Sequence, residues 1–141
     1  MQVVDDNHCF ICGQQNPIGL RAVFATDPEK GRAETRVCIP EQFQGWQGIV
    51  HGGILSALLD EISAQACMAR GLQVVTSELR LRYRKPVSTG SEVTVIGEIV
   101  GERRRLIDVQ ARVEMDGEVM AEAEVIMFKT ARQAALPESS S

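Results

Sequence analysis

The chain has 141 residues, a length that favours one domain with a sizeable buried core. Its net charge of -4 argues against general nucleic-acid binding. No apolar run approaches the roughly 20 residues that are needed to span a bilayer, so we expect no membrane association. The first residues lack the basic and apolar regions of a secretory signal, and we therefore expect a cytoplasmic protein with reduced thiols.

Two of the four cysteines, Cys9 and Cys12, have the Cys-x-x-Cys spacing of metal ligands, and His8 precedes them. A closed zinc site needs four ligands, usually from two such pairs. Cys38 and Cys67 lie in a strand-like and a helix-like segment, and they do not form a second pair. We expect no bound metal and no cofactor, and we interpret the pair as small side chains that pack an N-terminal turn.

The first half of the chain predicts two strands and a long helix. Residues 1–17 are punctuated by glycine and proline and predict irregular structure. Residues 20–26 and 32–39 predict strands. The helix is predicted from about Gly53 to Arg70 and is apolar nearly all round, which is typical of a helix that is enclosed on most sides.

Three polar residues of this helix, Ser56, Asp60 and Ser63, are spaced so that they form one narrow stripe. A carboxylate among leucines and isoleucines is costly to bury without a partner. Asp60 is therefore expected to be either a member of an ion pair or a functional acid. Glu61 is the competing carboxylate, but it lies off the stripe.

Four further strands follow the helix. The spacing predicts them at 76–86, 92–101, 105–115 and 118–128, with apolar side chains at alternate positions. In the first of these strands Leu79, Leu81 and Tyr83 share one face, opposite a charged face. For the last hairpin we predict a three-residue loop, 115–117, because this length aligns the apolar faces of its two strands.

The order strand, strand, helix and four strands favours an α+β fold with an antiparallel sheet. One apolar sheet face must be covered, and only one long helix is available. We therefore expect a curved sheet wrapped around the helix, formed by residues 1–141 as a single domain. Residues 131–141 are expected to be a frayed tail.

Several ordered motifs resemble those of the PaaI-like acyl-CoA thioesterases, hotdog-fold proteins of the 4-hydroxybenzoyl-CoA thioesterase superfamily. The resemblance runs from about Cys9 to Lys129. The motifs that carry it are Cys12-Gly13…Asn16-Pro17-x-Gly19-Leu20, Gly45-Trp46-x-Gly48-Ile49-Val50-His51-Gly52-Gly53 and Tyr83-Arg84-Lys85-Pro86. Some family members have an asparagine or glutamine six residues before the histidine. Here that position is Gly45, with Gln44 and Gln47 nearby.

The resemblance implies a thioester hydrolase that acts on a small or medium acyl-CoA. Asp60 matches the catalytic acid of the family, and Thr76 matches a hydroxyl residue of related sites. Free amides at the helix start, from Gly52 and also Gly53, are expected to polarise the thioester carbonyl. Asp60 then acts as general base or as nucleophile. His51 lines the site, either in direct catalysis or as a helix cap.

Further substrate-binding candidates are Gln47, Gly53 and Ser56. Since CoA carries phosphates, cationic side chains are expected at the mouth of the site. The candidates are Arg80, Arg82, Arg84, Lys85 and Arg103–Arg105, of which we select Arg84 and Lys85. The competing interpretation is a charged strand face that is solvated or ion-paired.

Helix geometry separates the two halves of this site. The nine residues from His51 to Asp60 span about 13 Å along a helix axis at 1.5 Å per residue. One thioester carbon cannot contact both ends of that span. We therefore predict an obligate homodimer with shared active sites, in agreement with the family resemblance. A dimer of dimers is a further expectation, and the spacing does not decide between dimer and tetramer.

Two other interpretations compete with this one. The first is a non-catalytic acyl-CoA-binding hotdog protein. The second is a hotdog hydratase or dehydratase, which requires a histidine and an acid at a different spacing.

Overall fold

The computed structural model describes residues 3–130. In chain order its elements are β1 (Ala25–Asp27), β2 (Arg32–Cys38), the 3-10 helix η1 (Glu41–Phe43), α1 (Gly52–Ala69), β3 (Val74–Tyr83), β4 (Glu92–Arg103), β5 (Leu106–Met115) and β6 (Glu118–Lys129). The predicted order of two strands, one long helix and four strands is confirmed. The expected tail at 131–141 lies outside the described residues.

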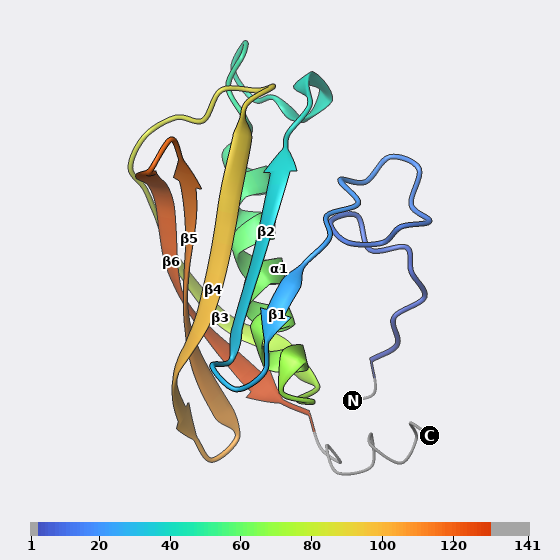
Figure 1. Cartoon of the computed structure of the whole chain (residues 1–141), viewed down its shortest axis with the longest axis vertical. Coiled ribbons are helices and arrows are strands. Elements are labelled where there is room, and N and C mark those ends of the chain that lie inside the picture. Colours follow the sequence, from blue (N-terminus) through green and yellow to red (C-terminus); the bar gives the residue numbers. More distant parts are fainter. Residues whose placement is uncertain (1–2, 131–141) are drawn as a thin grey trace.

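The strands form one antiparallel sheet in the order β1-β2-β4-β5-β6-β3. The sheet curves along one side of α1, and every strand contacts this helix (Figure 1). This is the α+β hotdog arrangement that the sequence predicts. The two edges of the sheet differ, because β1 has three residues and β3 has ten. Within residues 3–130 no helix has the length and apolarity to cross a membrane.

The core lies between α1 and the inner face of the sheet. The helix contributes buried residues along most of its length, and β4, β5 and β6 contribute alternate positions: Leu55, Leu58, Leu59, Ile62 and Ala66 from α1, and Val93, Val95, Ile107, Val109, Val113, Val125 and Met127 from the strands. At Gly97 of β4 the helix and the sheet are very close. A Cβ there would lie 3.0 Å from the carbonyl oxygen of Ile62.

The first strand is shorter than predicted. Residues 20–26 were expected to be extended, but only Ala25–Asp27 form β1. The N–H groups of Leu20 and Ala22 instead donate to the carbonyls of Phe10 and Ile11, each at 2.8 Å. This stretch therefore pairs with the N-terminal segment, a partner that apolar periodicity does not reveal.

The last hairpin aligns its apolar faces, but the predicted three-residue loop is wrong. Met115 pairs with Glu118, so the turn contains only Asp116 and Gly117. Both have positive φ, 52° and 77°, as a two-residue hairpin turn with this twist requires. A β-bulge next to the turn then shifts the register, so odd positions oppose odd positions along the rest of the hairpin.

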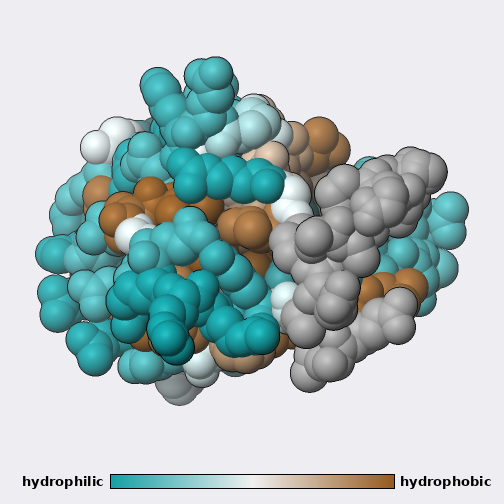
Figure 2. Space-filling model, turned by 90° about the horizontal axis from the view of Figure 1, so that it is seen from below, coloured by the Kyte–Doolittle hydropathy of each residue, from teal (hydrophilic) through white to brown (hydrophobic). Residues whose placement is uncertain are grey.

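The two ends of the helix face different surroundings. The end where α1 finishes is mainly hydrophilic, with smaller areas of apolar side chains between the polar ones (Figure 2). Near the start of α1, Trp46 is 83% exposed and Tyr83 is 54% exposed. Large side chains of this kind are enriched at protein interfaces.

Candidate active site

The helix start is shaped by His51. This residue is the N-cap of α1, and its Nδ1 accepts a hydrogen bond from the Gly53 N–H at 2.8 Å. The Gly53 amide is therefore already used within the chain. The Gly52 N–H, by contrast, has no acceptor among the residues that the structure describes. Of the two glycine amides that the sequence suggests, Gly52 is the free donor.

The loop before the helix is fixed by backbone and side-chain bonds. The Gly48 N–H donates to Gln44 Oε1 at 2.9 Å, and the His51 N–H donates to the Phe43 carbonyl at 3.0 Å. The side-chain oxygen of Gln44 is thus engaged inside the loop, whereas Gln47 is exposed. A Cβ at Gly45 would lie 3.2 Å from His51 Cα, a close contact that a larger residue could make only with a small shift of His51.

The carboxylate of the site is held by a neighbouring strand. Asp60 is partly buried in α1, and its Oδ1 accepts a hydrogen bond from the Thr76 hydroxyl of β3. Both residues are among those that the family resemblance suggests for the site, and the structure places them in contact. A hydroxyl that donates to the carboxylate fixes the orientation of the carboxylate.

Strict alternation along β3 would place Thr76 with the charged, outward-facing residues. A β-bulge between Thr76 and Glu78 reverses this placement. Thr76 therefore pairs with Met127, a buried position on the inner face of the sheet. The irregularity turns the hydroxyl toward α1 and so creates the Asp60 contact.

A residue of the site that the sequence does not reveal is Tyr83. Its hydroxyl donates to the Gly52 carbonyl at 2.8 Å, which ties the end of β3 to the start of α1.

The two serines of the polar stripe differ from each other. Ser56 is half-buried, but Ser63 is fully buried and donates to the Leu59 carbonyl of its own helix. Ser63 therefore does not belong to the site.

Most cationic candidates are already paired with carboxylates. Arg84 contacts Glu122, Lys85 contacts Glu118, Arg80 contacts Glu124 and Arg103 contacts Asp108. Within residues 3–130 no ion pair involves Arg82, Arg104 or Arg105.

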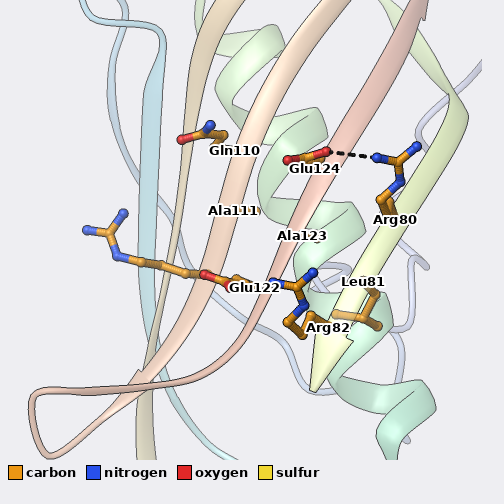
Figure 3. Close-up of a pocket in the computed structure, with 9 residues that line it drawn as sticks. Arg80, Leu81, Arg82, Gln110, Ala111, Glu122, Ala123 and Glu124 are labelled. Atoms are coloured by element: carbon orange, nitrogen blue, oxygen red, sulfur yellow. Dashed lines mark ion pairs between the residues drawn. The ribbon is translucent and has the colours of Figure 1, made fainter. Parts of the chain in front are cut away.

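Arg80 and Arg82 border a hollow of about 270 Å³ on the outer face of the sheet, opposite to the face that α1 covers (Figure 3). Its lining residues are Arg80, Leu81, Arg82, Gln110, Ala111, Arg112, Glu122, Ala123 and Glu124. Arg80, Arg84, Lys85 and Arg103 each contact a carboxylate in the structure. A CoA phosphate that binds one of these cations would therefore have to compete with that carboxylate.

One group of side chains within residues 3–130 has the chemistry of a metal site. It consists of Cys9, Cys12 and Glu61, whose ligand atoms all lie within 4.8 Å of one another. The cysteine spacing is visible in the sequence. Glu61 is not, because it lies far along the chain and joins the pair only through the packing of the N-terminal segment on α1.

Residues 47–122, more than half of the chain, match the family described as the thioesterase superfamily. The chain belongs to the thioesterase superfamily. The matched region contains the helix start, Asp60, Thr76 and Tyr83.

The chain is also similar to individual named proteins. Over 81 residues it is 32% identical to acyl-coenzyme A thioesterase 13 of Mus musculus, a match that covers 56% of each protein. The chain thus spans little more than half the length of this relative.

Solved structures agree with the fold. A thioesterase superfamily protein has a TM-score of 0.80 and 26% identity, over 85% of this chain and 62% of that one. A variant of the phenylacetic acid degradation protein PaaI from Thermus thermophilus has a TM-score of 0.72 and 26% identity, over 79% and 95% of the two chains. The hotdog fold and the expected resemblance to PaaI-like proteins are confirmed.

Proposed function

We propose that this protein hydrolyses the thioester bond of acyl-CoA. The observation that carries the proposal is the Asp60 carboxylate, set in the middle of an apolar helix and oriented by the Thr76 hydroxyl. At the start of the same helix the Gly52 N–H is free to donate. An activating carboxylate and an amide donor at a helix N-terminus are the two groups that thioester hydrolysis requires.

The two groups lie too far apart to act on one carbonyl within one chain. Helix α1 is continuous from Gly52 to Ala69. The eight residues between Gly52 and Asp60 therefore correspond to about 12 Å along the axis. A complete site combines Gly52 of one protomer with Asp60 of a second.

Strand β3 offers the surface for this association. It is a sheet edge of ten residues, and among the described residues it pairs only with β6. A long edge strand presents unpaired N–H and C=O groups that a second copy can satisfy.

The direction of β3 brings the two half-sites together. The strand runs from Thr76, beside Asp60, to Tyr83, beside Gly52. Two β3 strands that pair antiparallel about a point midway between these positions would place the Thr76 of one copy beside the Tyr83 of the other. The carboxylate of each protomer then approaches the helix start of its partner. The same operation produces two equivalent sites per dimer.

In this site the substrate carbonyl oxygen accepts a hydrogen bond from the Gly52 N–H, which stabilises the negative charge of the tetrahedral intermediate. Asp60 of the opposite protomer either removes a proton from the attacking water or attacks the carbonyl carbon itself. Collapse of the intermediate breaks the C–S bond, and CoA leaves as a thiolate that takes up a proton, from Asp60 in the general-base route or from solvent in the nucleophilic route. In the nucleophilic route water then hydrolyses the mixed anhydride on Asp60 to the free acid. His51 holds the Gly53 amide and so shapes the entry to the helix, rather than reacting itself.

The phosphates of CoA would be bound by cationic side chains without an internal carboxylate partner. Arg82, Arg104 and Arg105 meet this condition within the described residues, whereas Arg84 and Lys85 would have to exchange their partners. Gln47, exposed beside the helix start, is the remaining candidate for orienting water or substrate.

The test is release of free thiol from a panel of acyl-CoA esters with aromatic, short and medium acyl groups. The proposal predicts turnover of at least one ester. Binding of an ester without release of thiol would instead favour a non-catalytic acyl-CoA-binding protein.

A further inference from the structure

The cluster formed by Cys9, Cys12 and Glu61 lies on the side of α1 that faces the N-terminal segment. Cys9 Sγ is 3.8 Å from Glu61 Oε1, and the three ligand atoms lie within 4.8 Å of one another. All three residues are partly buried. The separation of the ligand atoms is close to that in a metal site with sulfur bonds of about 2.3 Å and oxygen bonds of about 2.0–2.2 Å.

The turn that carries the two cysteines directs two backbone amides at one sulfur atom. The N–H groups of Ile11 and Cys12 both donate to Cys9 Sγ at 3.4 Å. The turn closes tightly, because the Gly13 N–H donates to the Cys9 carbonyl at 2.8 Å. A Cβ at Gly13 would lie 2.4 Å from Cys9 N, so only glycine fits there. Amides that are directed at a sulfur atom hold it in one position, as the outer-shell contacts of a metal ligand do.

Glu61 is held in place by an additional contact. The Gln65 Nε2 donates to Glu61 Oε2 at 2.8 Å, one helical turn further along α1. This leaves Oε1 directed toward Cys9. A carboxylate that is fixed through its second oxygen is the usual arrangement around a bound metal.

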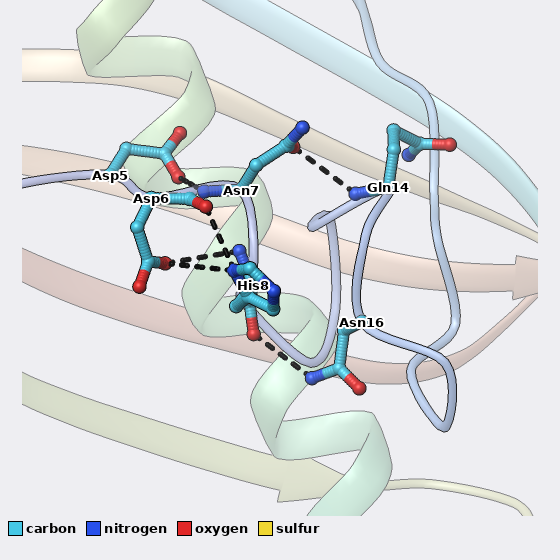
Figure 4. A network of polar contacts seen from close by, with 6 residues as sticks. All are labelled: Asp5, Asp6, Asn7, His8, Gln14 and Asn16. Atoms are coloured by element: carbon cyan, nitrogen blue, oxygen red, sulfur yellow. Dashed lines mark hydrogen bonds and ion pairs between the residues drawn. The ribbon is translucent and has the colours of Figure 1, made fainter.

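His8 does not complete the ligand set in this conformation. Its Nδ1 lies 2.9 Å from the Asp6 carbonyl oxygen and 3.7 Å from Asp6 Oδ1. Figure 4 shows His8 within a polar network of the N-terminal segment, in which the Asn16 side chain donates to the His8 carbonyl at 2.9 Å. A metal ion bound at this cluster would therefore take three ligands from the protein, and water would complete a tetrahedral set.

From this arrangement we propose that Cys9, Cys12 and Glu61 bind one zinc ion. Two thiolates select a borderline-soft ion such as zinc over magnesium or calcium. Each thiol loses its proton on binding, so the complex forms with release of about two protons per zinc ion. The ion would fasten the N-terminal segment to α1 beside Asp60, the neighbour of Glu61 in the chain. The cysteines then have a role beyond packing a turn.

The test is titration of the reduced, metal-stripped full-length protein with zinc chloride in competition with a chromophoric chelator. We expect one zinc ion per chain. Cobalt chloride, added in place of zinc, should give a thiolate-to-cobalt charge-transfer band. Cys9→Ser and Cys12→Ser should abolish both signals. Cys38→Ser is the matched control, because Cys38 is exposed on β2 and lies outside the cluster.

Variants outside the cysteines keep the proposal testable if the serine variants do not fold. Glu61→Gln should weaken zinc binding and alter the cobalt spectrum, and Gln65→Ala should weaken binding by about 10-fold. Absence of stoichiometric binding by the reduced wild type would overturn the proposal. So would zinc affinity that does not change in Glu61→Gln and in the cysteine variants. Because these readouts measure metal and not turnover, they are independent of the proposed hydrolase activity.

Discussion

The Thr76 hydroxyl of β3 donates a hydrogen bond to the Asp60 carboxylate of α1. This contact crosses from the sheet to the central helix, and it exists because a β-bulge turns Thr76 to the inner face. It orients the one carboxylate that the apolar helix presents within reach of the β3 edge.

Removal of this hydroxyl should reduce turnover. For Thr76→Val we predict a fall in kcat of about 10-fold, since a hydrogen bond to a charged group contributes roughly 1.5–3 kcal/mol. KM should change little, because the hydroxyl acts on the carboxylate. Thr76→Ser keeps the hydroxyl and should retain most of the activity. Equal losses in both variants would show that packing of the threonine methyl matters, and not the hydrogen bond.

The Tyr83 hydroxyl should stabilise the helix start. Tyr83→Phe removes its bond to the Gly52 carbonyl and should lower the free energy of unfolding by about 0.5–1 kcal/mol, the low end for a hydrogen bond because the residue is half exposed. Urea unfolding at one fixed protein concentration measures this change, since dimer stability depends on concentration. An unchanged unfolding midpoint would contradict the assigned role.

The close approach of α1 to β4 should make Gly97 intolerant of a side chain. Gly97→Ala places a Cβ against the backbone of Ile62, which cannot move away alone, and should destabilise the fold by about 1–3 kcal/mol. Gly101→Ala in the same strand is the matched control. Its Cβ would meet only the Asp108 side chain, with the carboxylate at 3.1 Å, and this side chain can move by a few tenths of an ångström together with its partner Arg103. Thermal unfolding of the two variants should therefore differ clearly, and equal melting temperatures would contradict this packing.

Two cysteines should react at very different rates with a thiol reagent. Burial raises the pKa of the Cys67 thiol to about 12, so near neutral pH it stays protonated and unreactive. Cys38 is exposed on β2 and should be labelled first. Mass spectrometry of peptides from the native protein measures the order, with denatured protein as the control in which both react. Early labelling of Cys67 would show that the core opens readily.

Apolar periodicity predicted the fold well, because the pattern reflects burial directly. The change from helical to alternating spacing after Gly71 located β3, and the chain of apolar residues from Leu55 to Ala66 located the enclosed helix. Asp60 stood out in the same pattern as a candidate, since a carboxylate among buried leucines is unusual.

The sequence did not predict features that depend on local irregularity or on distant packing. The bulges at Thr76 and beside the last turn shift the register by one residue, and alternation alone cannot show such a shift. Nor does the spacing show that the Gly53 N–H donates to the His51 ring, whereas the Gly52 N–H has no acceptor among the described residues. The contact of Glu61 with the cysteine turn depends on how the N-terminal segment folds back on α1.

The shared site can be tested with mixed dimers. Gly52→Pro removes the amide proton at the first helical position, where proline is otherwise well accepted. His51 already has the extended backbone, φ -60° and ψ 135°, that a following proline requires. Gly52→Ala is the matched control, because it adds the same Cβ beside the Tyr83 ring and keeps the N–H.

Thiol release from an acyl-CoA substrate should be low for Asp60→Asn and for Gly52→Pro when each is purified alone. Loss of one oxyanion donor costs about 100- to 1,000-fold in kcat. Co-expression of the two variants at equal levels should restore about a quarter of wild-type activity, because half of the dimers are mixed and each contains one intact site. Activity of the co-expressed protein that stays at the average of the two single variants would contradict a site built from Gly52 of one protomer and Asp60 of its partner.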